Sequence, residues 1–171
     1  MFKAEDIKTY HRTFSKAERD TIRTYLDRGK WSYGNISSKN GYQNAPPFWG
    51  MVLMDEEFFT EHLFQKVQET VGEELILDDC YCNGSVYGTG GQPHVDAYDE
   101  RGRTFLWYAN EGWDIRWNGK TVFLFDEGPQ FIVPEINKSI YFPGMVKHFS
   151  EETTRTFGGM RKTLVWKTQL K

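Results

Sequence analysis

The chain has 171 residues, with 21 Lys and Arg against 24 Asp and Glu, which gives a formal net charge of −3. This length predicts a single domain, residues 1–171, that needs no disulfide framework. The slight acidic excess argues against a nucleic-acid-binding protein or a polybasic membrane-surface protein. Because no apolar run is long enough to span a bilayer and the N-terminus lacks a signal-peptide pattern, we expect a soluble, intracellular protein of the cytoplasm.

Two helices are predicted in the first 74 residues. Ser15 opens the first helix, Glu18 completes its capping box three residues later, and Gly29 ends it. Asp55 is predicted to cap the second helix, whose apolar residues recur every four positions until Gly72 ends it. Short strands are expected before and after the first helix, at residues 7–14 and 48–54.

The segment 31–47 between the first helix and the next strand is polar in the middle and aromatic at both ends. It is long for a connection in a compact domain, and such segments often serve as lids or binding loops. We therefore predict helical support and a substrate lid within residues 1–74. The aromatic residues of 31–49, with the later cluster of Trp107, Trp113 and Trp117, fit a rim around a substrate groove, with ordinary packing against a sheet as the alternative.

From residue 75 onward, short strand-like runs alternate with Gly, Asn, Asp and Pro. Strands are predicted at 75–87, 93–97, 103–109, 121–125, 130–133, 138–142, 146–149 and 161–169. This pattern indicates a mainly β (α+β) protein in which residues 75–171 form a jelly-roll core with the N-terminal helices packed on it. Cys80 and Cys82 lie two positions apart, which suits neither a relaxed disulfide nor a complete zinc site, so free thiols are expected.

Three residues suggest a metal site. His94 and Asp96 lie two positions apart on a predicted strand, so their side chains would share a face, and His148 lies on another predicted strand. Two histidines and one carboxylate inside a β barrel would form the facial triad that holds non-haem Fe(II) and leaves positions open. A His-x-Asp tripeptide alone is weak support. The other two histidines, His11 and His62, are expected to be structural or solvated.

Arg161 and Thr163 strengthen this interpretation. They lie thirteen and fifteen residues after His148, on one face of the last predicted strand. A buried Arg needs an anionic partner, and a guanidinium group matches a carboxylate in bidentate fashion. An Arg and a hydroxyl facing a metal pocket are what a dicarboxylate co-substrate requires.

Several short motifs follow one another between Tyr87 and Gln169, each weak alone but specific in this order and spacing. They are Tyr87 with the Gly-rich segment after it, His94-Val95-Asp96, Tyr108-Ala109-Asn110, Trp113, Gly119-Lys120-Thr121-Val122-Phe123, Phe142-Pro143-Gly144, His148 and Arg161-Lys162-Thr163-Leu164-Val165-Trp166. With these motifs, about half of the chain resembles the Fe(II)- and 2-oxoglutarate-dependent oxygenases, and within them the prolyl 4-hydroxylase type.

The resemblance implies a double-stranded β-helix, the cupin-like jelly roll, with Fe(II), 2-oxoglutarate and O2 at one site. It admits ascorbate as an accessory cofactor. It assigns iron to His94, Asp96 and His148, the distal carboxylate of 2-oxoglutarate to Arg161, hydroxyl contacts to Tyr108 and Thr163, and a place in the pocket to Tyr87. Trp166 is expected either close to this site or in the plain core.

The activity implied by the resemblance is hydroxylation of an unactivated C–H bond, first of all on a peptidyl residue such as proline. Asp96 favours hydroxylation over halogenation, because related halogenases carry a small residue there. The same chemistry on a small metabolite or a carrier-bound substrate is the nearest alternative. A non-catalytic jelly-roll ligand-binding module and a cupin-type metal-dependent hydrolase or isomerase are further alternatives. No nucleic-acid or membrane partner is expected, and the sequence predicts no oligomeric state.

Overall fold

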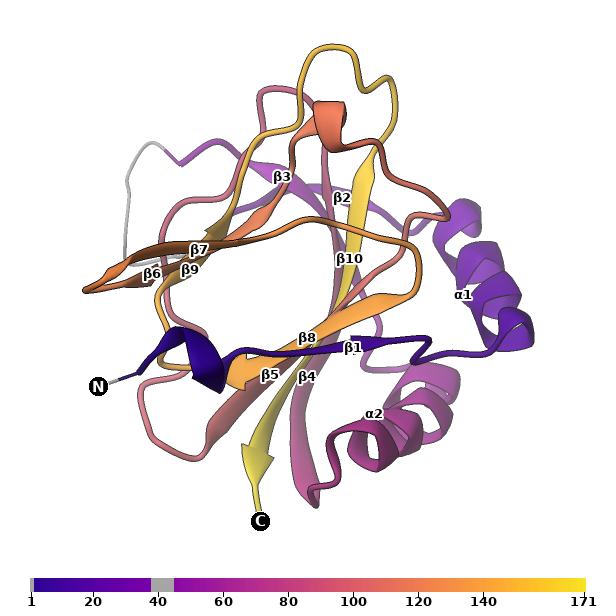
Figure 1. Ribbon diagram of the computed structural model, residues 1–171. Coiled ribbons are helices and arrows are strands. Elements are labelled where there is room, and N and C mark those ends of the chain that lie inside the picture. Colours follow the sequence, from indigo (N-terminus) through magenta and orange to yellow (C-terminus); the bar gives the residue numbers. More distant parts are fainter. Residues whose placement is uncertain (1, 38–44) are drawn as a thin grey trace.

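The computed structural model describes residues 2–37 and 45–171, and these form two facing β-sheets with two helices outside the larger one (Figure 1). The strands are β1 (Lys8–His11), β2 (Ser32–Asn35), β3 (Phe48–Val52), β4 (Leu75–Ser85), β5 (Gly102–Tyr108), β6 (Thr121–Phe125), β7 (Gly128–Ile132), β8 (Lys138–Pro143), β9 (His148–Ser150) and β10 (Arg161–Leu170). The helical elements are η1 (Ala4–Asp6), α1 (Lys16–Arg28), η2 (Phe58–His62), α2 (Leu63–Val71) and η3 (Ile115–Trp117).

All strand pairs are antiparallel. The large sheet has the order β1-β8-β5-β10-β4-β3-β2, and the small sheet has the order β7-β6-β9. Together they form a double-stranded β-helix, as the strand pattern and the resemblance predicted. The first 74 residues do more than support this core, because they supply β1, β2 and β3 to the large sheet.

Alternation along the strands divides the buried residues into two cores. On β10, Leu164 and Trp166 belong to the core between the large sheet and the helices, whereas Val165 belongs to the core between the two sheets. The same alternation on β5 separates Phe105 and Trp107 from Leu106 and Tyr108. Figure 1 shows α1 and α2 on the side of the large sheet opposite to β6, β7 and β9. One face of the sheet therefore carries the helices, and the other encloses the barrel interior.

The first helix confirms its predicted ends. The Ser15 side chain accepts a hydrogen bond from the Glu18 backbone N–H, and the Glu18 carboxylate accepts one from the Ser15 N–H at 2.7 Å. Gly29 ends the helix in the left-handed region with φ 51°. The prediction for Asp55 is wrong, because the second helical segment begins at Glu57 without a side-chain cap and opens with the π-helical turn η2. Gly72 ends α2 as expected.

Two segments differ from the predicted elements. Ser32–Asn35 is strand β2 rather than part of a loop, because it pairs with β3. The predicted lid also includes residues 38–44, which lie outside the described residues. Segment 93–97 forms no strand; only His94 makes a bridge, to His148. Pro93 offers no N–H to a ladder, and Asp96 and Ala97 both donate their N–H groups to the Gly144 carbonyl.

Close packing fixes this irregular segment beside the barrel. A Cβ at Gly144 would lie 2.7 Å from the Cβ of Ala97, so only glycine allows the approach. Asp96 is thereby held against β8 and β5 without being part of a ladder. In the part of the chain that the structure describes, no helix is long and apolar enough to cross a membrane.

Candidate metal centre and its cavity

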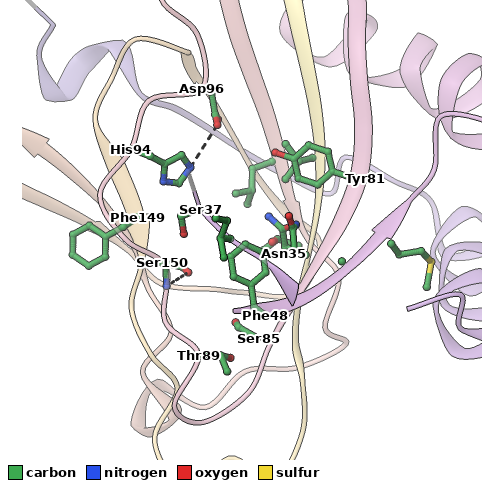
Figure 2. Close-up of a pocket in the computed structure, with 18 of the residues that line it drawn as sticks. Asn35, Ser37, Phe48, Tyr81, Ser85, Thr89, His94, Asp96, Phe149 and Ser150 are labelled. Carbon is green, nitrogen blue, oxygen red and sulfur yellow. Dashed lines mark hydrogen bonds and ion pairs between the residues drawn. The ribbon is translucent and has the colours of Figure 1, made fainter. Parts of the chain in front are cut away.

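A cavity of about 760 Å³ lies inside the barrel, and residues of β2, β3 and the small sheet are part of its lining. Its inner wall comes from alternate residues of β4, β5 and β10, and its other side includes His94, Asp96, His148 and Thr121. Figure 2 shows His94 and Asp96 at one end of this cavity and Ser85 and Thr89 at the other. The cavity is thus long enough to hold different groups at its two ends.

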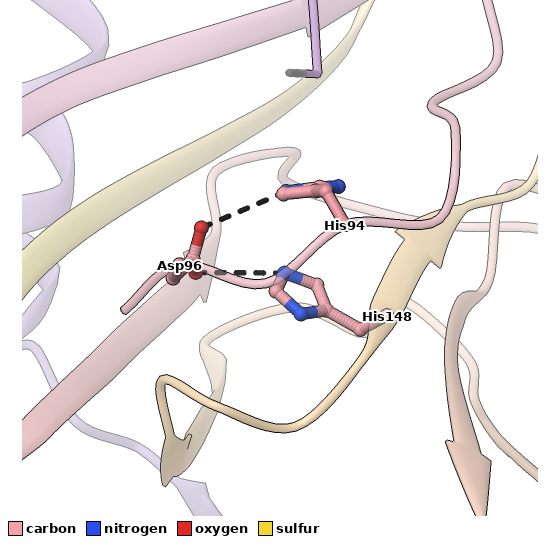
Figure 3. Close-up of side chains that lie close together, drawn as sticks. All are labelled: His94, Asp96 and His148. Atoms are coloured by element: carbon pink, nitrogen blue, oxygen red, sulfur yellow. Dashed lines mark ion pairs between the residues drawn. The ribbon is translucent and has the colours of Figure 1, made fainter. Parts of the chain in front are cut away.

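His94, Asp96 and His148 meet at the first of these ends (Figure 3). One potential ligand atom from each lies within 4.8 Å of the others. The Nε2 atom of His94 is 3.6 Å from Asp96 Oδ1, and that of His148 is 3.5 Å from Asp96 Oδ2. The structure therefore brings together the three residues that the sequence proposed as metal ligands, although only His148 lies on a strand.

Hydrogen bonds behind the two histidines set their tautomers. His94 Nδ1 lies 2.8 Å from the Gln92 carbonyl, and His148 Nδ1 lies 2.9 Å from the Val146 carbonyl. Since a carbonyl can only accept, each neutral ring carries its proton on Nδ1 and turns the lone pair of Nε2 toward Asp96. Two lone pairs and a carboxylate then face one point, an arrangement that a divalent cation satisfies.

The surroundings keep these groups in their metal-binding forms. Burial alone would raise the pKa of Asp96, but the neighbouring His148 and His94 side chains and the charge of Lys167 hold it well below its usual range. Burial lowers the pKa of His148, partly opposed by the Asp96 charge. Asp96 also accepts a hydrogen bond from the Thr104 hydroxyl at 2.8 Å. The carboxylate is thus ionised and oriented, and His148 is neutral.

Arg161 lies deep in the cavity and is only 3% exposed. Its Nε donates to the Gly119 carbonyl at 2.7 Å and its Nη2 to the Thr121 hydroxyl at 3.1 Å. Within the described residues, no carboxylate lies within ion-pair distance of it. Ser85, its partner across the β10–β4 ladder, is buried with no hydrogen-bond partner for its hydroxyl. A buried cation beside an unsatisfied hydroxyl fits the carboxylate of a bound co-substrate.

The remaining predicted site residues have different places. Thr163 lines the cavity as expected. Tyr108 is buried behind the cavity wall, where its hydroxyl is 2.7 Å from the Thr121 hydroxyl and its ring lies 5.5 Å from the Arg161 guanidinium carbon. Tyr87 is 57% exposed and does not line the cavity, so its predicted place in the pocket is wrong. Trp166 faces the helices and donates to the Phe59 carbonyl, as the plain-core alternative predicted.

The predicted aromatic rim is present only in part. Tyr33 and Phe48 line the cavity, and Tyr33 packs against Trp49 with ring centroids 5.2 Å apart. Trp113 and Trp117 instead pack with Phe157 and do not line it.

Sequence analysis missed several polar residues of the cavity, among them Ser85, Thr104, Thr121 and Lys167. The signal for Lys167 was available, because it continues the alternation that places Arg161 and Thr163 on one face of the last strand. The sequence did not show that this face of the strand points into the barrel along its whole length.

No protein-family model and no curated protein sequence matches the chain. Solved structures, in contrast, match most of the chain. An oxidoreductase of the 2OG-Fe(II) oxygenase family from Burkholderia pseudomallei is 11% identical, with a TM-score of 0.74 over 97% of this chain and 86% of that one. The chain has the fold of the 2OG-Fe(II) oxygenases. The 2OG in that family name is 2-oxoglutarate, the co-substrate expected from the sequence.

Two further structures share this oxygenase fold. A Trichoplax adhaerens prolyl hydroxylase, in complex with a hypoxia inducible factor peptide fragment, is 13% identical, with a TM-score of 0.70 over 97% of this chain and 84% of that one. HygX from Streptomyces hygroscopicus, with nickel, 2-oxoglutarate and hygromycin B bound, is 9% identical, with a TM-score of 0.65 over 99% of this chain and 88% of that one. The same fold thus accommodates a peptide fragment in one protein and hygromycin B in another.

Proposed function

We propose that the protein is an Fe(II)- and 2-oxoglutarate-dependent oxygenase that hydroxylates an unactivated C–H bond. The observation that carries this proposal is the presence, in one cavity, of a His-Asp-His cluster and a buried Arg that no carboxylate of the described residues pairs. A ligand-binding module has no need of both. A cupin-type hydrolase or isomerase would need the metal, but gives no reason for the buried Arg.

His94, Asp96 and His148 would hold Fe(II), which supplies the redox chemistry that couples O2 to the oxidation of both organic substrates. The reaction balances when C–H, O2 and 2-oxoglutarate give C–OH, succinate and CO2, with one oxygen atom in the alcohol and the other in succinate. Arg161 would bind the distal carboxylate of 2-oxoglutarate, with Ser85 and Thr163 offering hydroxyl groups beside it. Tyr108 would support this end from behind, through Thr121.

For the organic substrate, a peptidyl residue such as proline is our first proposal. The fold shared with a prolyl hydroxylase that holds a peptide supports it, as do the aromatic rings of Tyr33 and Phe48 at the cavity. The same chemistry on a small metabolite is the alternative, which the fold shared with HygX supports. Stimulation by ascorbate stays a prediction of the resemblance.

A cytoplasmic location is part of the proposal. Cys80 and Cys82 are both buried and free, which is the usual state of thiols in a reducing compartment.

Anaerobic spectroscopy tests the proposed chemistry. Adding 2-oxoglutarate to the Fe(II) protein should produce a weak visible absorption band, and admission of O2 should then release succinate. At the same 2-oxoglutarate concentration, the Arg161→Ala variant should show neither, while it still binds Fe(II). A wild-type protein that binds Fe(II) but gives no band and no succinate would favour the binding module or the hydrolase.

A further inference from the structure

Lys167 is a second cation in the cavity, and it is neither a candidate metal ligand nor part of the Arg161 end. Its Nζ lies 3.0 Å from Asp96 Oδ1, and its side chain is 30% exposed. It also lies 5.8 Å from the centre of the Tyr81 ring, which is part of the same cavity wall. An ammonium group therefore sits directly beside the candidate metal and remains accessible from the cavity.

Lys167 and Arg161 divide the cavity between them. They lie six residues apart on the same face of β10, roughly 20 Å along the strand. Arg161 is paired in register with Ser85, whereas Lys167 is paired with Asp79. A co-substrate that extends from Arg161 to the metal would have its metal-side end near Lys167. The space around Lys167 is thus on the side left for the organic substrate.

The positive groups on this side attract an anion. With Fe(II) in place, two neutral histidines, the Asp96 carboxylate, Arg161 and a doubly charged 2-oxoglutarate sum to zero, which leaves Lys167 and Asp79 as the other charged residues of the lining. Fe(II) and Lys167 would also share Asp96, so two positive centres would stand close together. Asp79 lines the cavity too, but the ion pairs among the described residues do not join it to Lys167. A negative group of the substrate, placed between Fe(II) and Lys167, would be attracted by both.

We infer that Lys167 binds a carboxylate of the substrate, so that the oxidised carbon belongs to a residue with a carboxylate nearby. This inference rests on the proposed function and narrows its substrate class. The carboxylate can come from a free or C-terminal amino acid, or from an acidic side chain next to the target residue in a peptide. A neutral residue inside a peptide chain would offer Lys167 no anionic group besides Asp96, which the metal also needs.

Equilibrium binding to the Mn(II)- and 2-oxoglutarate-loaded protein tests the inference without turnover. Each probe is an acid with its matched amide: L-proline with L-prolinamide, glycyl-proline with its amide, and a blocked Pro-Glu dipeptide with blocked Pro-Gln. Calorimetry should give at least one acid bound about tenfold more tightly than its amide, as expected for one charge-assisted hydrogen bond. The pair that shows this preference identifies the source of the carboxylate.

Three variants assign the preference to one side chain. Lys167→Met should reduce the acid-to-amide ratio to within about twofold of one, and Lys167→Arg should keep part of it because it keeps the charge. Lys162→Met is the matched control, since Lys162 lies on the same strand and its Nζ lies 3.3 Å from Asp27 Oδ1, on the helix side. It should leave the ratio unchanged.

Four outcomes overturn the inference. The first is that no acid in the panel binds more tightly than its amide, and the second is that the preference persists in Lys167→Met. The third is that Lys167→Met raises the 2-oxoglutarate requirement as strongly as Arg161→Ala, which would make Lys167 a co-substrate residue. The fourth is that Lys167→Met weakens Mn(II) binding and leaves the acid-to-amide ratio intact, which would make Lys167 a positioning residue for Asp96. Failure of the proposed function is distinct, because the wild-type protein would then fail to bind 2-oxoglutarate, whether or not it binds Mn(II).

Discussion

His94, Asp96 and His148 act as a unit, because each directs a lone pair at the same point. Removing one ligand leaves an incomplete site rather than a weaker complete one. We expect His148→Ala to lower the affinity for Fe(II) or Mn(II) by more than about 100-fold. Loss of a residue that only hydrogen-bonds to a metal ligand costs about 10- to 100-fold, and loss of the ligand itself should cost more. 2-Oxoglutarate turnover should stop in the same variant.

Anaerobic calorimetry measures this effect, with circular dichroism to confirm that the variant is folded. His62→Ala is the control, because His62 also contacts a carboxylate, that of Glu18 at 2.9 Å, but lies outside the cavity. Undiminished metal binding in His148→Ala would show that the metal site lies elsewhere.

The pH dependence of metal binding follows from the same residues. A protonated imidazole cannot ligate a metal, and burial lowers the pKa of His148 below the ordinary value of about 6.5. Asp96 remains ionised to a lower pH still. Competition from protons at these two ligands should therefore become appreciable only below about pH 6.5. Mn(II) titrations between about pH 5 and about pH 8 test this, and a loss centred above pH 7 would contradict it.

Arg161 is proposed to bind the co-substrate rather than the metal. Arg161→Ala should raise the apparent 2-oxoglutarate requirement strongly, because loss of a charged contact in a desolvated pocket costs about 2–5 kcal/mol. Arg161→Lys should recover part of the lost 2-oxoglutarate affinity, since lysine keeps the charge but lacks the bidentate geometry of the guanidinium group. Succinate release as a function of 2-oxoglutarate concentration measures both. An unchanged requirement in Arg161→Ala would move the co-substrate to another cation, and Arg155 is the next to test.

At the scale of elements, β10 serves the site and the core with opposite faces. Arg161, Thr163 and Lys167 line the cavity, while Leu164 and Trp166 pack toward α2 and its preceding turn. Mutations on the helix side should therefore change stability without changing the site. The two sets of residues are separated because successive side chains of a strand point to opposite faces of the sheet, although they are neighbours along the chain.

Leu63 in α2 tests this separation, because it is fully buried in the helix-side core. Leu63→Ala should lower the free energy of unfolding by about 2–5 kcal/mol. The Mn(II) affinity of the folded variant should stay within about twofold of the wild type. Denaturant titration and calorimetry measure the two quantities. Lys66→Ala, on the exposed side of the same helix, should change stability by less than about 0.5 kcal/mol.

At the scale of the whole molecule, the candidate metal site joins parts of the fold that are distant in sequence. His94 and Asp96 precede β5, and His148 begins β9. A ligand that binds only when these parts are assembled stabilises the folded state by about 2.7 kcal/mol at about 100 times its dissociation constant. For a domain of this size, each kcal/mol raises Tm by about 2–4 °C.

Mn(II) at that excess should therefore raise Tm by about 5–10 °C. Calorimetric scanning with and without EDTA checks this, since EDTA should reverse the shift. 2-Oxoglutarate should add a further shift in the wild type but not in Arg161→Ala. A shift of the same size in His148→Ala would mean that Mn(II) stabilises the protein through another site.

The sequence by itself determined the features that depend on neighbouring residues. The capping box of Ser15 and Glu18 and the stop at Gly29 follow from local backbone hydrogen bonding, so the first helix was predicted closely. The period of two placed Arg161 and Thr163 on one face of β10. The order of the motifs then indicated the fold and the metal ligands.

Only the tertiary structure decided which face of each strand looks inward and what meets across the barrel. It placed Trp166 in the helix-side core and Tyr87 at the surface, and it brought Ser85 to Arg161 and Lys167 to Asp96. The physical reason is that alternation fixes which residues share a face, whereas burial of that face depends on long-range pairing. His94 bridges to His148, 54 residues later, and no local pattern encodes that contact.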